Sequence, residues 1–198
     1  MRHGWVYIYG SPPVEARFKE IVEILSKKGI FLERPGSGEV ARVSTEGERI
    51  VSSEQDILKE LQASHDVPIQ LYLDESTGIF CSIEKLGPDV IRESYSLDGK
   101  TEEESLDVIQ SLIELFSYRA KHATAFAIVV DKFAELHRDF HWDDFVLGNT
   151  VPPEWPMFLG FSKNFHIPKN LPSSYALSDK GSYLSGGTLN PNLKKLNH

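Results

Sequence analysis

Residues 67–86 read Val-Pro-Ile-Gln-Leu-Tyr-Leu-Asp-Glu-Ser-Thr-Gly-Ile-Phe-Cys-Ser-Ile-Glu-Lys-Leu, and this stretch decides the fold that we expect. Ile69, Leu71 and Leu73 alternate with polar or aromatic residues, which is the two-residue period of a half-buried strand. A turn-forming run at 74–78 separates this strand from a second one at 78–86. Because a parallel crossover needs a dozen or more residues, so short a connection predicts an antiparallel pair.

Strand patterns continue on both sides of this pair. Residues 90–97 follow as a third strand, and residues 40–45 and 48–51 predict a hairpin across Glu46-Gly47. Further strands are expected at 5–9 and 30–33 from their aromatic and β-branched residues. Residues 124–130 are almost wholly apolar, which is typical of a central strand buried on both faces. The pattern predicts a mainly antiparallel sheet of at least five strands.

Two long amphipathic helices are expected to pack on this sheet, at 12–28 and 101–121. Ser11 can cap the first helix, which begins with a proline and keeps a 3.6-residue apolar period. Thr101 and Glu104 form a capping-box pattern at the start of the second helix. Ser52 and Gln55 predict a short helix between the hairpin and the central strands, and residues 132–145 are also expected to be helical.

The fold class that follows is α+β, with an irregular, proline-rich C-terminal segment. Six prolines interrupt the chain beyond residue 151, and the last 25 residues are rich in Ser, Asn, Gly and Lys. No linker or internal repeat divides the sequence. We therefore expect one α+β domain over residues 1–170 and an irregular, mobile tail over residues 171–198.

The charge of the chain narrows the class of partner. The chain has 29 acidic and 21 basic residues, a net charge of −8. Residues 84–154 are the most acidic part, with 15 acidic and 7 basic groups. Such a region repels phosphate and anionic lipid, so we expect neither nucleic acid nor a membrane as partner. It would attract a protein with a basic surface, although acidity that only maintains solubility is the alternative.

Composition also indicates the compartment. Cys81 is the single cysteine, so no internal disulfide can form and export is not indicated. The apolar stretch at residues 5–9 is shorter than the roughly 7–15 residues of a signal-peptide core, and no apolar run approaches the roughly 20 residues that span a bilayer. We expect a cytoplasmic protein.

Residues with the potential for chemistry do not form a recognised catalytic pattern, so we expect neither an enzyme nor a cofactor. Cys81 alternates with Ile79 and Ile83 in a strand, which favours a buried apolar role. His137 and His141 are four residues apart and could share a helix face, but they lack evident third and fourth metal ligands. We expect no metal, and the alternative is an enzyme whose site is assembled from dispersed Asp, Glu and His.

Two sets of aromatic residues require an explanation. Tyr72 and Phe80 fall on the sheet face opposite the aliphatic residues, so we expect a second layer to cover them. The other set lies among acidic residues between 137 and 165, and it suits either an irregular packing layer or a protein interface in which rings anchor and carboxylates steer. The predicted partner-binding residues of this interface are Asp139, Trp142, Asp143, Asp144, Glu154 and Trp155.

Residues 67–131 resemble the small bacterial immunity proteins that neutralise polymorphic or contact-dependent-inhibition toxins. The resemblance lies in Ile-Gln-Leu-Tyr-Leu-Asp-Glu, Gly-Ile-Phe-Cys-Ser-Ile, Glu-Ser-Tyr-Ser-Leu, the acid-led helix and Ala-Phe-Ala-Ile-Val-Val-Asp. It includes no diagnostic motif, so it assigns no residue a role. It implies a non-catalytic, protein-binding module that neutralises a cognate toxin. The alternatives are a hydrolase or transferase and a structural or assembly component.

Overall fold

All ten strands found in the described residues join one sheet. The computed structural model describes residues 4–132, 141–148, 150–152, 155–167, 171 and 177–187. The strand order is β3-β2-β4-β5-β6-β1-β7-β8-β10-β9, and all the recorded pairs are antiparallel, as the sequence predicts. The strands are β1 (Trp5–Gly10), β2 (Val40–Val43), β3 (Arg49–Ser52), β4 (Asp66–Tyr72), β5 (Gly78–Lys85), β6 (Ile91–Ser96), β7 (Ala125–Asp131), β8 (Phe158–Ser162), β9 (Ser178–Asp179) and β10 (Tyr183–Gly187).

The central pair, β4 and β5, has the register that the alternating sequence requires. Gln70 pairs with Phe80, and Ile69 pairs with Cys81. In the connecting loop, the carboxylate of Asp74 accepts hydrogen bonds from the backbone N–H groups of Ser76 and Thr77, each at 2.7 Å. These bonds lower the pKa of Asp74 to about 2, so the loop is held by a carboxylate that stays ionised.

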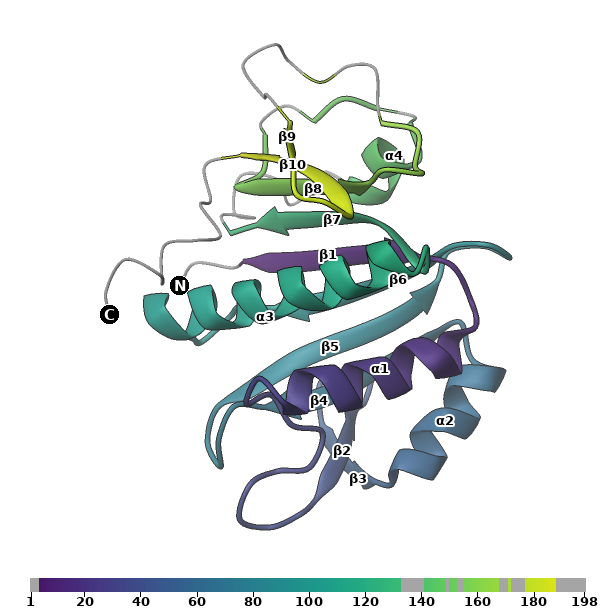
Figure 1. The fold of residues 1–198 in the computed structure, drawn as a ribbon. Helices are drawn as coiled ribbons and strands as arrows, with labels where there is room; N and C mark the ends of the chain where they lie inside the picture. The colour runs from purple at the N-terminus through teal and green to yellow at the C-terminus, as the bar shows by residue number, and fades with distance from the viewer. Residues whose placement is uncertain are drawn as a thin grey trace.

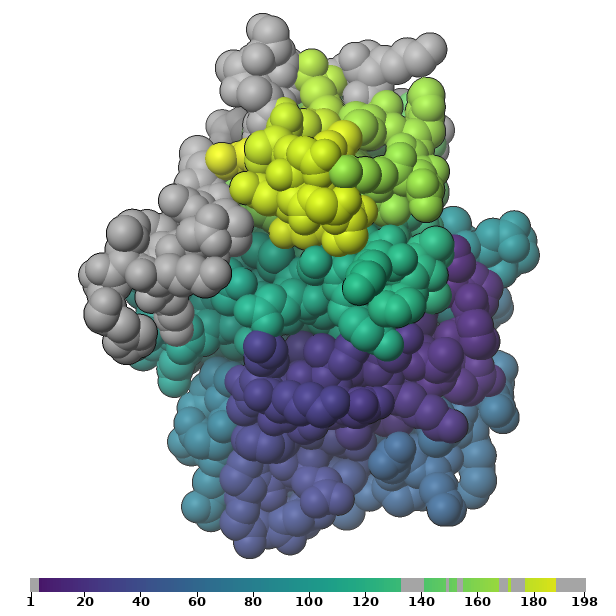
Figure 2. Space-filling view, viewed as in Figure 1, coloured from purple at the N-terminus to yellow at the C-terminus, as the bar shows by residue number. Residues whose placement is uncertain are grey.

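In the described part of the chain three helices cover one face of the sheet, namely α1 (Val14–Ser26), the short α2 (Glu54–Ala63) and α3 (Glu102–Lys121), where only two long ones were expected to pack on it. Figure 1 shows α1 and α3 side by side across this face, and Figure 2 shows their side chains forming a continuous surface over the sheet. The capping box of Thr101 and Glu104 is confirmed. The ten residues of α2 pack against α1 and β4, so the short helix also belongs to this layer.

Two predicted helix starts are wrong by one or two residues. The N-cap of α1 is Pro13, without a side-chain hydrogen bond, because the backbone N–H of Ser11 still bonds across the sheet to the Thr124 carbonyl at 3.2 Å. The N-cap of α2 is Ser53, whose hydroxyl accepts from the Asp56 N–H at 3.1 Å. Ser52 lies in β3 instead, paired with Val40.

Two further expectations need correction. Residues 30–33 are not a strand, because the chain bends at 32–33 and turns at 35–37, and only Phe31 forms a bridge, to Tyr72. The segment expected to be irregular contains β8, β9 and β10. The strand β8 could not be predicted from the sequence, because all five of its residues are buried and polar and apolar residues do not alternate along it. The remainder of the predicted tail, and most of the predicted helix at 132–145, lie outside the described residues.

The helix-covered face buries the larger core and one fully enclosed ion cluster. Glu93 of β6 accepts from the Arg17 guanidinium of α1 at 2.7 Å and from Arg119 of α3 at 2.8 and 2.7 Å. Tyr95 donates to the same carboxylate at 2.8 Å, and Arg119 also binds Glu20 at 2.7 Å. All three central side chains are at most 2% exposed, so the cluster ties two helices to one strand.

The opposite face of the sheet is covered only in part. A second apolar cluster packs over β7 and β8, where α4 (Trp142–Val146) contributes Phe145 and Val146. Ala127, Val129, Leu159 and Phe161 from the two strands complete it, together with Tyr9 of β1. This confirms that β7 is buried on both faces. Over β4, β5 and β6 no comparable apolar layer is present among the described residues.

Candidate functional site

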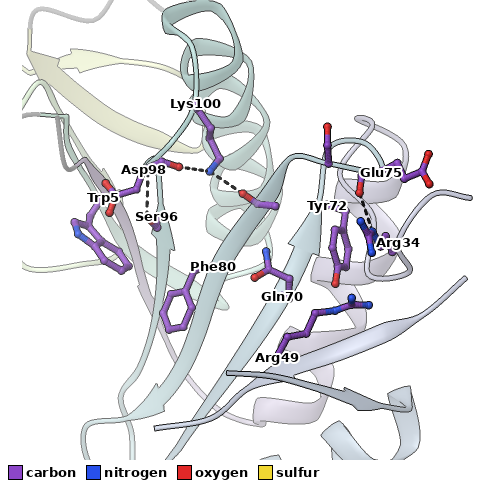
Figure 3. A pocket seen from close by; sticks show the side chains of 12 residues that line it. Trp5, Arg34, Arg49, Gln70, Tyr72, Glu75, Phe80, Ser96, Asp98 and Lys100 are labelled. Atoms are coloured by element: carbon purple, nitrogen blue, oxygen red, sulfur yellow. Dashed lines mark hydrogen bonds between the residues drawn. The ribbon is translucent and has the colours of Figure 1, made fainter. Parts of the chain in front are cut away.

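The uncovered part of the sheet forms a hollow of about 650 Å³ above β4, β5 and β6. Strand register brings one side chain from each strand to this surface, so that Phe80 of β5 lies between Gln70 of β4 and the β6 strand. Ser96 is small, and Gly78 has no side chain, so the Gln70 amide lies over its Cα. The lining residues, all drawn in Figure 3, are Trp5, Arg34, Arg49, Gln70, Tyr72, Glu75, Ser76, Gly78, Phe80, Ser96, Asp98 and Lys100.

Aromatic rings form one side of this hollow. Trp5 and Phe80 meet edge to face with ring centroids 6.1 Å apart, and Trp5 also stacks on Tyr7 at 6.2 Å. All three side chains are half-buried; Trp5 and Tyr7 belong to β1, and Phe80 belongs to β5, one strand beyond β6. Figure 3 shows the Trp5 and Phe80 rings on the same side of the hollow, away from the arginines. Strands hold such rings in place, so they offer apolar contact area at a low entropic cost of binding.

Three cations also line the hollow: Arg34 and Arg49 lie opposite the rings and Lys100 lies beside Asp98 (Figure 3), and two of the three bond to backbone carbonyls. The Nε of Arg34 donates to the Glu75 backbone carbonyl at 2.7 Å. The Nζ of Lys100 donates to the backbone carbonyls of Gly78 at 2.9 Å and Asp98 at 3.0 Å. Figure 3 shows that the Glu75 carboxylate points away from the hollow while its carbonyl faces Arg34. The cations are therefore oriented without a direct carboxylate partner on the floor of the hollow.

Tyr72 and Arg49 close the end of the hollow nearest the sheet edge. The Arg49 guanidinium lies 5.9 Å from the centre of the Tyr72 ring and bonds to the exposed carboxylate of Glu39 at 2.9 Å. Tyr72 is 5% exposed, and its hydroxyl forms no well-aligned hydrogen bond with any described residue. A buried hydroxyl without a well-aligned partner costs about 1–3 kcal/mol, so an oxygen acceptor that reached this atom would recover that cost.

Burial sets the electrostatics of the hollow. It lowers the pKa of the Lys100 amine, although the carboxylates of Asp98 and Glu104 oppose this effect. Burial likewise raises the pKa of Tyr7, beside Trp5, to about 12. The Lys100 ammonium is thus a partly desolvated charge, and an anion bound beside it would meet less water than at an open surface.

We expected a second layer of the protein to cover Tyr72 and Phe80. Among the described residues no such layer lies over either ring. Both line the hollow, and the Arg49 guanidinium lies over the Tyr72 ring, which is buried. Their alternation with aliphatic residues was the sequence signal for this site. It was not decisive, because the pattern of one strand does not show how far a covering layer extends.

The predicted acidic and aromatic interface lies around α4. Its described residues do not form one exposed surface, because some are buried and others are exposed. Trp142 is 3% exposed and donates from Nε1 to Asp131 at 3.0 Å. Asp143 accepts from the Tyr9 hydroxyl at 2.8 Å and pairs with Arg92 at 2.5 Å. Asp144 is exposed, and half-buried Trp155 meets Phe145 edge to face at 5.6 Å. Asp139 and Glu154 lie outside the described residues.

The residues considered for metal and nucleophilic chemistry are also separated. His137 lies outside the described residues, and exposed His141 precedes α4. Across the part of the chain that the structure describes, no three His, Cys, Asp or Glu side chains gather as metal ligands would. Cys81 is fully buried, as predicted, and burial raises the pKa of its thiol. None of the described helices is both long and apolar enough to cross a membrane.

Comparison with known proteins gives partial structural similarity only. No protein-family model and no curated protein matches the chain. Among solved structures, a chain of the 1.75 Å crystal structure of the toxic C-terminal tip of CdiA from Pseudomonas aeruginosa in complex with immune protein is similar over 67% of this chain and 87% of that chain. The TM-score is 0.39 and the sequence identity is 10%, a similarity too low to assign a common fold or function.

Proposed function

We propose that this protein is a non-catalytic module that binds another protein through the uncovered half of its sheet. The observation that carries the proposal is the hollow itself, in which Trp5 and Phe80 stand on rigid strands opposite oriented cations. Binding sites of proteins combine aromatic anchors with a small number of fixed polar groups in this way. The half-buried rings also have apolar surface left to bury.

The covered half of the same face shows what such a surface accepts. There Phe145 and neighbouring rings pack on β7 and β8, and Phe161 stacks on Phe165 with centroids 6.3 Å apart. The hollow has rings of the same kind beside it, but no described segment of the chain lies on them. A partner that inserts an apolar side chain between Trp5 and Phe80 would extend the same kind of packing across the sheet.

We further propose that the partner is a bacterial toxin and that the protein acts in the cytoplasm as an immunity protein. This step rests on the sequence resemblance and on the acidic composition, which keeps the protein away from nucleic acid. An immunity protein needs only to occupy a surface of its toxin, and a preformed hollow with fixed anchors meets that need. Asp144, with its exposed carboxylate, remains a proposed contact at the edge of this surface.

The experiment is co-expression with the product of the adjacent gene. We expect that product to arrest growth when expressed alone, this chain to restore growth, and the two proteins to copurify. Ser82→Arg should abolish rescue, because Ser82 is half-buried and its pairing with Pro68 and Ser94 places it on the uncovered face. Lys19→Glu, on the exposed side of α1, is the matched control.

Two results would contradict the proposal. A neighbouring product that is harmless and does not copurify would remove the toxin interpretation. Full rescue by a correctly folded Ser82→Arg variant would show that the uncovered sheet face is not the binding surface.

A further inference from the structure

Arg34 is the exception among the arginines that the structure describes. Every other one forms an ion pair with a carboxylate, as expected in a chain with net charge −8. Arg34 instead donates to a backbone carbonyl, and no described carboxylate pairs with it. It lies in the hollow, where Figure 3 places it beside Tyr72. The paired arginines are Arg17, Arg42, Arg49, Arg92 and Arg119.

Lys100 repeats this arrangement at the rim of the same hollow. Its ammonium has three N–H donors, and two of them bond to the carbonyls of Gly78 and Asp98. Among the described residues no carboxylate forms an ion pair with it, although it is half-buried. Partial burial of a cation without a carboxylate is unfavourable, unless an anion joins it in the bound state.

The unused donors converge on one chemistry. Arg34 keeps the Nη donors of its guanidinium, Lys100 keeps one N–H, and the Tyr72 hydroxyl, beside Arg49, forms no well-aligned hydrogen bond with a described residue. All three groups can donate to an oxygen anion, and a guanidinium matches a carboxylate with two parallel bonds. The Trp5 and Phe80 rings lie across the hollow from Arg34 (Figure 3) and would contact an apolar neighbour of that anion.

We propose that the hollow binds an acidic peptide segment of the protein partner, with a carboxylate at Arg34 and Lys100 and an apolar or aromatic side chain at Trp5 and Phe80. The inference rests on the proposed function. It differs from the sequence analysis, which predicts a partner with a basic surface, because here the partner contributes the acidic group. A single carboxylate fits better than a phosphate-rich polymer, since a chain with a net charge of −8 repels polyanions.

The test uses a displayed library of random linear peptides, selected against the full chain. We expect enriched peptides to contain Asp or Glu near Trp, Tyr, Phe or Leu. The best binder is then synthesised together with a twin in which Asp or Glu is replaced by Asn or Gln. The twin should bind about tenfold more weakly, because charge-assisted hydrogen bonds are roughly twice as strong as neutral ones.

Variants of the protein give the second arm. Arg34→Gln and Lys100→Gln each keep an N–H donor for the backbone carbonyls but remove the charge, so each should weaken the peptide about tenfold without unfolding the protein. Arg34→Lys and Lys100→Arg should keep most of the affinity. Lys19→Gln on exposed α1 is the control and should change nothing.

The outcomes separate this inference from the proposed function. Enriched peptides without acidic residues, equal affinity for both twins, or no loss in the Gln variants would overturn the inference while leaving toxin rescue intact. Preferential binding of an oligonucleotide or of inorganic phosphate at these residues would also overturn it. If the adjacent gene product proves harmless, an acidic peptide that needs Arg34 and Lys100 would still establish the site.

Discussion

Two groups of charged residues lie on opposite faces of the same sheet, and their partners differ. Beneath the helices, Glu93 is surrounded by Arg17, Arg119 and the Tyr95 hydroxyl. In the hollow, Arg34 and Lys100 bond to backbone carbonyls. In the first group the buried arginines are paired with carboxylates and water is excluded, so this group should affect the stability of the fold. In the second group the cations are held in place by carbonyls but form no ion pair with a described residue, so this group should affect the binding of an anionic ligand.

The comparison predicts its largest effect at Glu93. Glu93→Gln leaves two buried guanidinium groups without their shared carboxylate and should lower the free energy of unfolding by about 3–5 kcal/mol. Urea unfolding measures this loss. The control is Glu23→Gln, which removes an exposed ion pair with Lys27 on α1 and should cost less than about 0.5 kcal/mol. A loss below about 1 kcal/mol at Glu93 would show that the buried cluster does not hold the fold.

Removing an aromatic ring should cost more unfolding free energy on the covered half of the sheet than on the uncovered half. Phe145→Ala removes a fully buried ring from the covered half and should cost about 3–5 kcal/mol of unfolding free energy. Phe80→Ala removes a half-buried ring from the hollow and should cost about 1 kcal/mol. Thermal unfolding of the two variants gives the comparison. Equal losses would mean that the hollow is part of the core rather than a binding surface.

Lowering the pH should destabilise the buried ion cluster by protonating Glu93. Burial raises the pKa of this carboxyl, but Arg119 and Arg17 outweigh burial and hold the pKa below its usual range. The unfolded state then binds more protons, so this contribution is complete above the ordinary glutamate pKa of about 4.3 and is lost as pH falls through the folded-state pKa. Carbon-detected NMR titration of the Glu93 carboxyl measures the pKa. A value above about 4.3 would contradict the ion cluster.

The cations of the hollow should affect stability least. Lys100→Gln keeps the possibility of hydrogen bonds to Gly78 and Asp98, so the free energy of unfolding should stay within about 0.5 kcal/mol of the parent. Urea unfolding of this variant, run beside Lys19→Gln, makes the comparison. A loss of about 2 kcal/mol or more would place Lys100 with the structural charges and remove the contrast between the two groups.

The sequence predicted the elements whose signals are local. The β4–β5 pair follows from alternation between Ile69 and Leu71, and α3 follows from the capping box of Thr101 and Glu104. The strand β8 was not predicted, because Phe158 to Ser162 are buried throughout and flanked by prolines. Short buried strands give no periodic signal, and their pairing depends on distant residues.

The candidate site was less predictable than the fold. Tyr72 and Phe80 were evident as rings on the polar face, but Trp5, Arg34 and Lys100 join them from three other parts of the chain only when the sheet forms. The buried cluster of Arg17, Glu93 and Arg119 was equally hidden, because nothing local distinguishes these side chains from exposed charges. Pairing across long sequence separations is a property of the fold rather than of a motif.

The most direct test of the account compares the hollow with the exposed acidic residue beside α4. Calorimetry would measure the affinity of the adjacent gene product for the parent, for Phe80→Arg and for Asp144→Lys. We predict that Phe80→Arg weakens binding about thirtyfold or more, equivalent to about 2 kcal/mol, because it disrupts a central anchor. Asp144→Lys should change affinity only a few-fold. Unchanged affinity in a folded Phe80→Arg variant, with a large loss for Asp144→Lys, would contradict the claim that the uncovered sheet face binds the partner.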